Sequence, residues 1–403
     1  MDCRGHLRAC ESARVADDAS FALQKGDIIY VDVGFTKAYL QRGGGKKAVV
    51  KSGGNTVLSS RTEAPCFFIS KNGDKVMKKI LTVVLSLLIG CVGTVMFVGC
   101  DQRTVIGVLQ YAEHGSLTNC YDGILSGLKE RGYTEEKINI VYYNAKGVDA
   151  DNTTYASTLI NRAPAVAVGI ATPSAYALAS QSRGSVPVVF TAVSDPLAES
   201  ADFSLFNNVT GTSDKLPVAG QLKLISDFYK EKEPDRTEAV KVGILFTKSE
   251  ANSVSQIAEF ESQASAYNIE IIAQSVDTAE DIPSAASVLL GKVDCLNNLT
   301  DNNVVNNLAM VLDKAKTAGK PVFGSEIEQV KLGCIASCSL DYFALGEVTG
   351  GMIADILDGT PVSGEFKFET IEDGYSVDYN SSVCEEFGFT LPAEYAGAND
   401  TAA

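Results

Sequence analysis

From Thr104 onward, short apolar runs rich in β-branched residues alternate with longer stretches of helical spacing. Strands are predicted at Thr104–Tyr111, Ile138–Tyr143, Ala165–Ile170 and Pro187–Ala192, and helices at Ser116–Arg131, at Asp151–Asn161 and from near Pro173. An alternating strand and helix order is typical of a parallel sheet covered by helices on both faces.

The same pattern begins again after Asn208–Asp214. Strands are predicted at Lys241–Thr247, Ile269–Ser275, Asp294–Leu299 and Pro321–Gly324, with helices near 251–267, 280–291 and 302–318. Two successive α/β units therefore predict two similar lobes.

A signal-like segment precedes the first lobe. Met77-Lys78-Lys79 is followed by a run without charged residues, Ile80 to Val98, and then by Gly99-Cys100. This order is typical of a secretory signal, and the closing cysteine makes it similar to a bacterial lipoprotein signal. We therefore expect 77–99 to be a signal peptide and Cys100 to carry lipid at the outer face of the cytoplasmic membrane. A transmembrane helix is the alternative, since the run is just long enough to span a bilayer.

Residues 1–76 have little periodicity and two glycine clusters, so they are interpreted as a spurious or unstructured extension before Met77, the expected true start. The stretch Gly43-Gly44-Gly45-Lys46-Lys47 lacks the spacing of a phosphate-binding loop.

Charge and cysteine usage exclude several classes of function. Residues 1–99 hold 14 basic and 8 acidic residues, which leaves 20 basic and 42 acidic residues in 100–403, a net charge of −22. With this much negative charge, residues 100–403 repel the phosphates of nucleic acid, so DNA or RNA binding is not predicted. Cys334 and Cys338 are four residues apart, but no second pair or histidine lies near them, so neither a metal site nor a cofactor is predicted.

Polar residues follow the predicted strands, where ligands bind in open α/β sheets. Capping of a helix would explain Thr172, Ser253 or Asp301 singly, but not the convergence of polar groups from both lobes on one cleft. We expect a small polar ligand there. The candidate ligand-binding residues are Glu113, His114, Thr172, Pro173, Ser174, Ser194, Asp195, Asp214, Asn252, Ser253, Thr300, Asp301, Asn302, Ser325 and Glu326.

A series of short stretches between Lys78 and about Pro392 carries a family resemblance through its order and spacing. The series includes Glu113-His114 with Leu117, Ala171-Thr172-Pro173, Val193-Ser194-Asp195-Pro196, Asn208 to Asp214, Thr300-Asp301-Asn302, Pro321 to Glu326 and Asp341-Tyr342. In these stretches the chain resembles the ABC-transporter solute-binding family that includes tryptophan- and tyrosine-type binding lipoproteins. Ser116, Thr118, Cys334 and Cys338 depart from the family pattern.

The resemblance implies a two-lobed type I periplasmic-binding-protein fold, in which three hinge strands join two mainly parallel sheets flanked by helices. Lobe 1 would comprise 100–213, completed by about 343–365, and lobe 2 would comprise 214–342. Residues 366–403 would form hinge strands and the C-terminal segment. Crossings are expected near Thr210–Asp214, Ser339–Tyr342 and Phe366–Tyr379. Such a protein captures a small solute by hinge closure and delivers it to an ABC permease with its ATPase.

The family's ligands suggest an amino acid, with aromatic ones favoured. Its carboxylate would bind at the helix start after Thr172, with hydroxyl groups from Thr172 and Ser174. Its ammonium group would pair with Asp301 first or Asp195 second. Tyr111 and Phe190 are candidates for an aromatic wall, although Phe190 better suits the core.

Three alternatives remain open. A ligand-sensing receptor domain would share this fold, as would a binding protein for a sugar or nucleoside, although the absence of tryptophan disfavours a sugar site. An enzyme is a third possibility. It would depend on His114 for acid–base chemistry, but no nucleophile motif or metal cluster supports it, so no catalysis is predicted.

Overall fold

The computed structural model describes residues 103–362, 365–371 and 375–402, together with the backbone of four strands between residues 28 and 56. The chain divides into two compact units, 1–98 and 99–403, and each is considered by itself. The segment 77–99 and Cys100 lie outside the described residues. No helix among the described residues is both long and apolar enough to cross a membrane.

The N-terminal unit contains a small antiparallel sheet. Its strands are β1 (Ile28–Val33), β2 (Thr36–Arg42), β3 (Ala48–Ser52) and β4 (Asn55–Thr56), paired in that order. This corrects the expectation of an extension without structure. The run Ile-Ile-Tyr-Val-Asp-Val in β1 has the β-branched composition that favours a strand, despite the weak periodicity around it.

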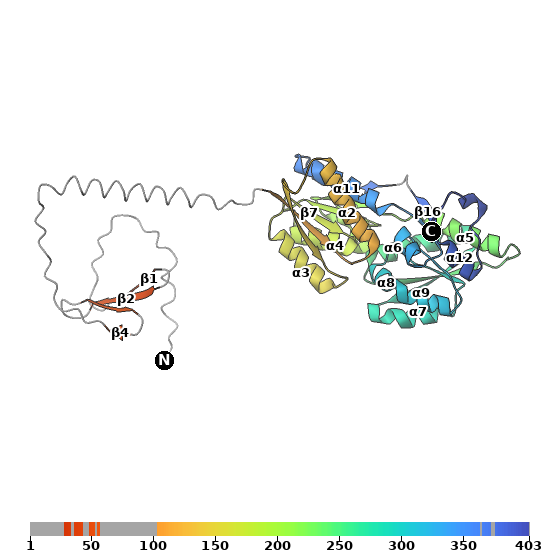
Figure 1. Cartoon of the computed structure of the whole chain (residues 1–403), viewed down its shortest axis with the longest axis horizontal. Coiled ribbons are helices and arrows are strands. Elements are labelled where there is room, and N and C mark those ends of the chain that lie inside the picture. The colour runs from red at the N-terminus through yellow and green to blue at the C-terminus, as the bar shows by residue number, and fades with distance from the viewer. Residues whose placement is uncertain are drawn as a thin grey trace, which may run out of the picture. The chain divides into compact units, whose positions relative to one another are not determined.

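Lobe 1 is a six-stranded sheet between two layers of helices (Figure 1). All its strands are parallel, in the order β15-β9-β8-β7-β5-β6. Along β5, Ile106 and Val108 pack on one face and Leu109 on the other, which is the period-two alternation of a strand buried on both sides. The strands are β5 (Thr104–Gln110), β6 (Ile138–Asn144), β7 (Val166–Ile170), β8 (Val188–Thr191), β9 (Val209–Ser213) and β15 (Glu369–Thr370).

Two long helices cover one face of this sheet, α2 (Gly115–Glu130) and α11 (Tyr342–Leu357). They run in parallel and touch backbone to backbone. A β-carbon added at Gly123 would lie 2.1 Å from the carbonyl oxygen of Phe343, and one at Gly346 would lie 2.2 Å from that of Cys120. Only glycine fits there, and the contact makes α11 part of lobe 1. The opposite face carries α3 (Asp149–Ile160) and α4 (Thr172–Ser182).

Lobe 2 repeats the architecture with a four-stranded parallel sheet in the order β11-β10-β12-β13. A bridge between Gly324 and Ser337 connects this sheet to a second one, β14-β16-β17. The strands are β10 (Val240–Thr247), β11 (Ile269–Val276), β12 (Cys295–Asn297), β13 (Val322–Phe323), β14 (Ala336–Ser339), β16 (Ser376–Tyr379) and β17 (Asn399–Asp400). One face packs on α5 (Val218–Lys232), α6 (Ala251–Gln263) and α12 (Ser381–Phe387), and the other packs on α7 (Ile282–Leu290), α8 (Asn302–Asn306), α9 (Leu308–Thr317) and α10 (Ile327–Leu332).

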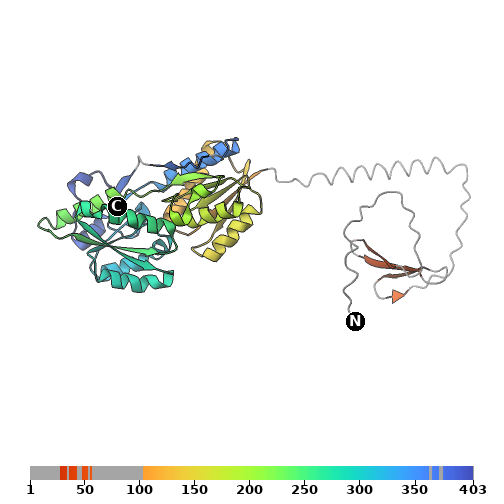
Figure 2. The same ribbon diagram turned by 180° about the vertical axis from the view of Figure 1, so that it is seen from behind.

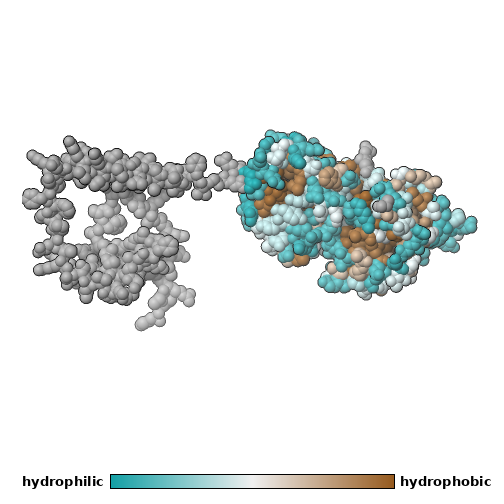
Figure 3. Space-filling view, viewed as in Figure 1, coloured by the Kyte–Doolittle hydropathy of each residue, from teal (hydrophilic) through white to brown (hydrophobic). Residues whose placement is uncertain are grey.

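The chain crosses between the lobes three times within residues 103–402. The crossings join β9 to α5, β14 to α11, and β15 to β16. These are the positions that the sequence predicted, and Figure 2 shows the two lobes from behind. Hydrophilic residues cover much of the face seen in Figure 3, with apolar patches between them.

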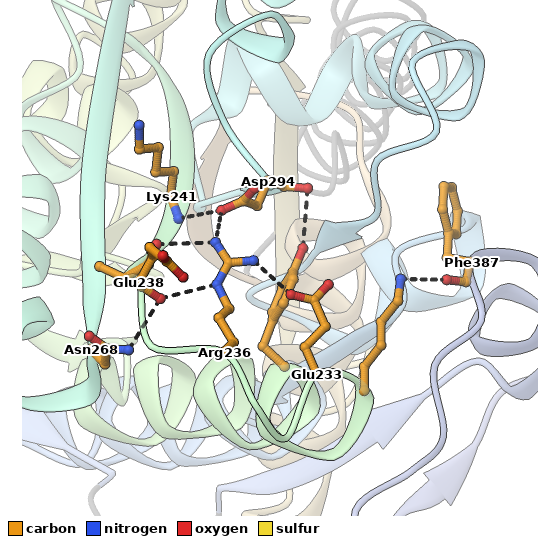
Figure 4. Close-up of polar contacts among 10 residues, drawn as sticks. Glu233, Arg236, Glu238, Lys241, Asn268, Asp294 and Phe387 are labelled. Atoms are coloured by element: carbon orange, nitrogen blue, oxygen red, sulfur yellow. Dashed lines mark hydrogen bonds and ion pairs between the residues drawn. The ribbon is translucent and has the colours of Figure 1, made fainter.

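The amino ends of the lobe 2 strands are held together by Arg236 (Figure 4). Its guanidinium donates to the carbonyl oxygens of Glu238 and Ala239 at 3.1 Å and to the carboxylate of Asp294 at 2.5 Å. The same carboxylate oxygen accepts the backbone N–H of Lys241 at 2.9 Å. One side chain thus connects the starts of β10 and β12, at the edge of the sheet opposite to the strand ends where ligands bind.

Replacing Arg236 by alanine should lower the free energy of unfolding by about 2 kcal/mol, because a carboxylate and two carbonyl groups lose their donor. Arg131→Ala is the control. Arg131 also pairs with two carboxylates, but its side chain is 42% exposed against 20% for Arg236, so we expect a clearly smaller loss than for Arg236. Denaturant unfolding measures both variants, and equal losses would contradict this interpretation.

Candidate ligand-binding site

A small pocket lies between the lobes, at the carboxyl ends of the strands. It receives side chains from both lobes and from two of the crossings, as the convergence argument predicts. Its lining residues are His114, Leu117, Ala171, Ala192, Ser194, Asp214, Asn252, Thr300, Asn302, Glu326 and Tyr342.

Lobe 1 offers the pocket two helix starts without side-chain caps. His114 precedes α2 and Ala171 precedes α4, and neither side chain caps its helix. The first turn of α4 holds no acidic residue, so its free backbone N–H groups and the helix dipole favour an anion there, whereas the start of α2 already faces the carboxylate of Glu326 beside Ser116.

Backbone strain is also present at the same edge of lobe 1. Ala171 after β7 has φ 76° and Ala192 after β8 has φ 54°, both in the left-handed region that alanine rarely adopts. Both residues line the pocket. Strained backbone conformations of this kind persist where a functional site requires them.

The first carboxylate in the pocket is Asp214, at the crossing after β9. It is 3% exposed and accepts hydrogen bonds from the hydroxyl groups of Ser194 at 3.0 Å and Tyr342 at 2.7 Å. Burial raises the pKa of Asp214, and these two donors oppose that rise only in part.

The second carboxylate is Glu326, between β13 and α10. It is 1% exposed, and one oxygen accepts a hydrogen bond from Gln329 at 3.1 Å. Oε2 has no partner within hydrogen-bond distance, although the Ser116 hydroxyl lies beside the carboxylate. Burial raises the pKa of Glu326 to about 7, and the Ser116 hydroxyl opposes that rise only in part. Neither Glu326 nor Asp214 forms an ion pair within the part of the chain that the structure describes. The pocket therefore concentrates negative charge without a protein cation.

Several contacts hold the two lobes against each other around the pocket. Nε2 of His114 lies 3.4 Å from Oδ1 of Asn302, and Ser255 donates to Asp195 at 2.5 Å. Asn119 on α2 donates to Glu328 on α10 at 3.1 Å. The lobes are closed, and they must part to admit a ligand.

Asp301, the first candidate for the ammonium group, has a different role. Its carboxylate is fully buried and accepts four hydrogen bonds, from the N–H and hydroxyl groups of Thr247, from Ser253 and from the N–H of Val304. All its acceptor positions are used, so it caps α8 and ties that helix to β10 and α6. The structure contradicts the prediction that it is free to pair with a ligand.

Other predicted residues also lie outside the lining. Ser174 donates to Asn152, Ser253 to Asp301 and Ser325 to the carbonyl oxygen of Asn298. Glu113 is exposed and lies 3.9 Å from Lys146, whereas Asp195 contributes to the contact between the lobes. Thr172 and Pro173 begin α4 beside Ala171 but are not among the lining residues.

Neither of the two candidates for the aromatic wall lines the pocket, although the sequence analysis already favoured the core for Phe190. Tyr111 donates to Asp149 at 2.8 Å outside this pocket, and Phe190 is a core residue that packs on Phe203. The aromatic lining residue is Tyr342, which the sequence singled out only as part of the resemblance. Leu117, Ala171 and Ala192 were also missed as lining residues, because an apolar side chain beside a strand end gives no chemical signal.

Asp301→Asn should lower the free energy of unfolding by about 2 kcal/mol, because an amide N–H₂ would face buried donors. Asp341→Asn is the matched control. Asp341 also caps a helix, by accepting from the N–H groups of Phe343 and Ala344, but it is exposed, and asparagine caps as well as aspartate. Chemical denaturation should therefore separate the two variants, and similar values would show that the buried network adds nothing.

Comparisons with known proteins agree with the fold. The model of the ABC transporter substrate binding protein family matches residues 105–398. A tyrosine-binding protein from Clostridioides difficile is 30% identical over 317 residues, which cover 73% of this chain and 88% of the relative.

Solved structures are similar over most of their length. An ABC domain from Streptococcus pneumoniae in complex with L-Trp has a TM-score of 0.67 at 30% identity, covering 74% of this chain and 98% of that one. The ligand-free, open structure of a substrate binding protein from Clostridium difficile has a TM-score of 0.55 at 28% identity, with the same coverage. The lower of the two scores belongs to the structure that was solved open.

More distant structures show the fold alone. One is a solute binding protein with bound allitol from Agrobacterium vitis, at 13% identity and a TM-score of 0.51, which covers 70% of this chain and 98% of that one. Members of the matched family bind substrates for transport and are not enzymes, as the sequence predicted. With a family model that spans the two lobes, this chain belongs to the ABC transporter substrate binding protein family.

Proposed function

We propose that the chain captures an amino acid between its lobes for an ABC importer. The observation that carries the proposal is the pair of buried carboxylates, Asp214 and Glu326, without a protein cation. Burying charge without a partner is costly, and a ligand with an ammonium group would supply the missing positive charge.

The opposite end of the ligand would be an anion. The uncapped start of α4 supplies N–H groups and a dipole that favour a carboxylate. A zwitterion matches a pocket that holds both buried carboxylates and an uncapped helix start. A neutral sugar would leave both carboxylates uncompensated, which favours an amino acid over that alternative.

The class of side chain is suggested by the relatives. One relative is named for tyrosine and another was solved with L-Trp, and Tyr342 with Leu117 could pack on a ring here. We infer that an aromatic amino acid is the preferred ligand. Delivery to a permease and its ATPase follows from the same family membership.

Closure would follow from where the binding groups lie. Helix starts belong to lobe 1, whereas Glu326 and Asn252 belong to lobe 2. Only the closed form brings both sets to one ligand, so binding favours closure.

A panel of amino acids, sugars and nucleosides tested by thermal shift would identify the ligand class. At a hundred times its dissociation constant, the matching amino acid should stabilise the folded protein by about 2.7 kcal/mol. A response to sugars or nucleosides alone would contradict the proposal.

The variant Glu326→Gln tests the same proposal more specifically, because the affinity for the ligand should fall while the stability of the ligand-free protein should rise. Affinity for the amino acid should fall at least tenfold at pH 8, since the ammonium group loses a charged partner. The ligand-free protein should instead gain stability at pH 8.

The sign of that gain follows from linkage. The pKa of Glu326 is raised from 4.5 to about 7, so the wild type loses stability as pH rises through that interval. Glutamine removes this loss, which amounts to at most about 3 kcal/mol, and the two proteins should converge below pH 4.5. Thermal unfolding between pH 4 and 8 measures the effect, and a variant less stable than wild type at pH 8 would make Glu326 a structural residue.

Anchoring is proposed at Cys100. Lys78-Lys79, the apolar run and the cysteine support a lipoprotein signal at 77–99 and an extracytoplasmic protein on the outer face of the membrane. Cys100→Ala should release the protein from the membrane or leave the precursor uncleaved, as fractionation and mass spectrometry of the N-terminus would show. Normal cleavage with undiminished membrane retention would exclude lipidation.

A further inference from the structure

Glu250 is a buried carboxylate that serves a neighbouring helix. It is the N-cap residue of α6 and 2% exposed, yet its side chain does not cap α6. It reaches the start of α8 instead. Oε2 accepts from the backbone N–H of Asn302 at 2.9 Å and from the side-chain amide of Asn302 at 2.7 Å, and Oε1 accepts from the N–H of Asn303 at 3.1 Å.

This contact determines which way the Asn302 amide faces. Because Nδ2 donates to Glu250, the atom 3.4 Å from Nε2 of His114 is Oδ1. An amide oxygen can only accept, so Nε2 of His114 must carry a proton and donate it. Asn302 belongs to lobe 2 and His114 to lobe 1, and the bond therefore exists only when the lobes are closed.

The second ring nitrogen of His114 is then an acceptor. Burial lowers the pKa of His114 to about 4, so the ring is neutral at pH 7. With the single proton on Nε2, Nδ1 keeps its lone pair. Nδ1 is buried and has no hydrogen-bond partner among the described residues, and His114 lines the pocket.

We propose that Glu250 is a positioning residue for ligand specificity, which acts through Asn302. When the lobes close, the oriented Asn302 amide fixes His114 as the Nε2–H tautomer. Nδ1 of His114 then accepts a hydrogen bond from a donor on the ligand. Glu250 is not among the residues that line the pocket. The proposal rests on the proposed function, in that an ammonium group is the donor that Nδ1 would receive.

Two further orphan acceptors in the pocket support this assignment. Asn252 donates through Nδ2 to the carbonyl oxygen of Thr300 at 3.3 Å, which leaves its Oδ1 without a partner. Oε2 of Glu326 also lacks one. These two atoms and Nδ1 of His114 all belong to residues that line the pocket, and a primary ammonium group offers three N–H donors. A buried acceptor without a donor is costly, so each selects for a ligand that donates.

The tautomer of His114 can be read directly from ¹⁵N chemical shifts of the imidazole in the full chain with the amino acid bound. The chain has only two histidines, His6 and His114, and the spectrum of His114→Asn identifies the second. We expect the Nε2–H tautomer at pH 7, with a proton from the ligand near Nδ1. An Nδ1–H tautomer or an imidazolium would overturn the proposal without any need for a Glu250 variant.

Glu250→Ala should release the Asn302 amide, mix the two tautomers and weaken amino-acid binding about tenfold. Asp301→Asn is the matched control, because Asp301 caps the same helix without touching the Asn302 side chain. It should lower stability and leave the tautomer unchanged. If the two variants change tautomer and affinity alike, Glu250 only caps α8. If a sugar binds while His114 stays in the Nε2–H tautomer, the ligand is not an amino acid, but the positioning role of Glu250 still holds.

Discussion

The backbone contact between α2 and α11 is the constraint on which the two-lobed arrangement depends. α11 follows lobe 2 in the chain, and it rejoins lobe 1 because Gly123 and Gly346 let the two helices touch. The helices run in parallel, so both begin at the cleft between the lobes. Their starts bring His114 and Tyr342 to one pocket, and the hydrogen bond from Tyr342 to Asp214 links the returning chain to the first crossing at 2.7 Å.

The site stores an electrostatic cost that a ligand would relieve. Asp214 and Glu326 are buried without a cation, and burial raises the pKa of both. Ala171 and Ala192 add backbone strain at the same place. A binding protein gains from such a site, because the free energy released on pairing these groups with a ligand can favour the closed lobes over the open ones.

Not every buried carboxylate near the cleft has this character. Asp301 is saturated with four donors, and Glu250 accepts three N–H groups, so both stabilise the start of α8. The difference between a cap and a binding group lies in the number of acceptor positions left open. Asp301 and Glu326 are both acidic residues that follow a strand of lobe 2, and the donors around each carboxylate distinguish them.

The sequence alone determined the α/β class, the two lobes and the eight strands of the alternating pattern, because hydrophobic periodicity is a local property, and the family resemblance implied the three crossings. The prediction at Thr104–Tyr111 differs from β5 by one residue, whereas the helix expected near 302–318 is two helices that meet at Asn307. Seven of the lining residues were predicted as well: His114, Ser194, Asp214, Asn252, Thr300, Asn302 and Glu326. Tertiary structure alone decided that Asp301 is a cap, that Tyr342 reaches Asp214, and that Asn302 meets His114. These three contacts join residues that are 54, 128 and 188 positions apart in the chain, respectively. No local pattern in the sequence shows which polar groups find a hydrogen-bond partner.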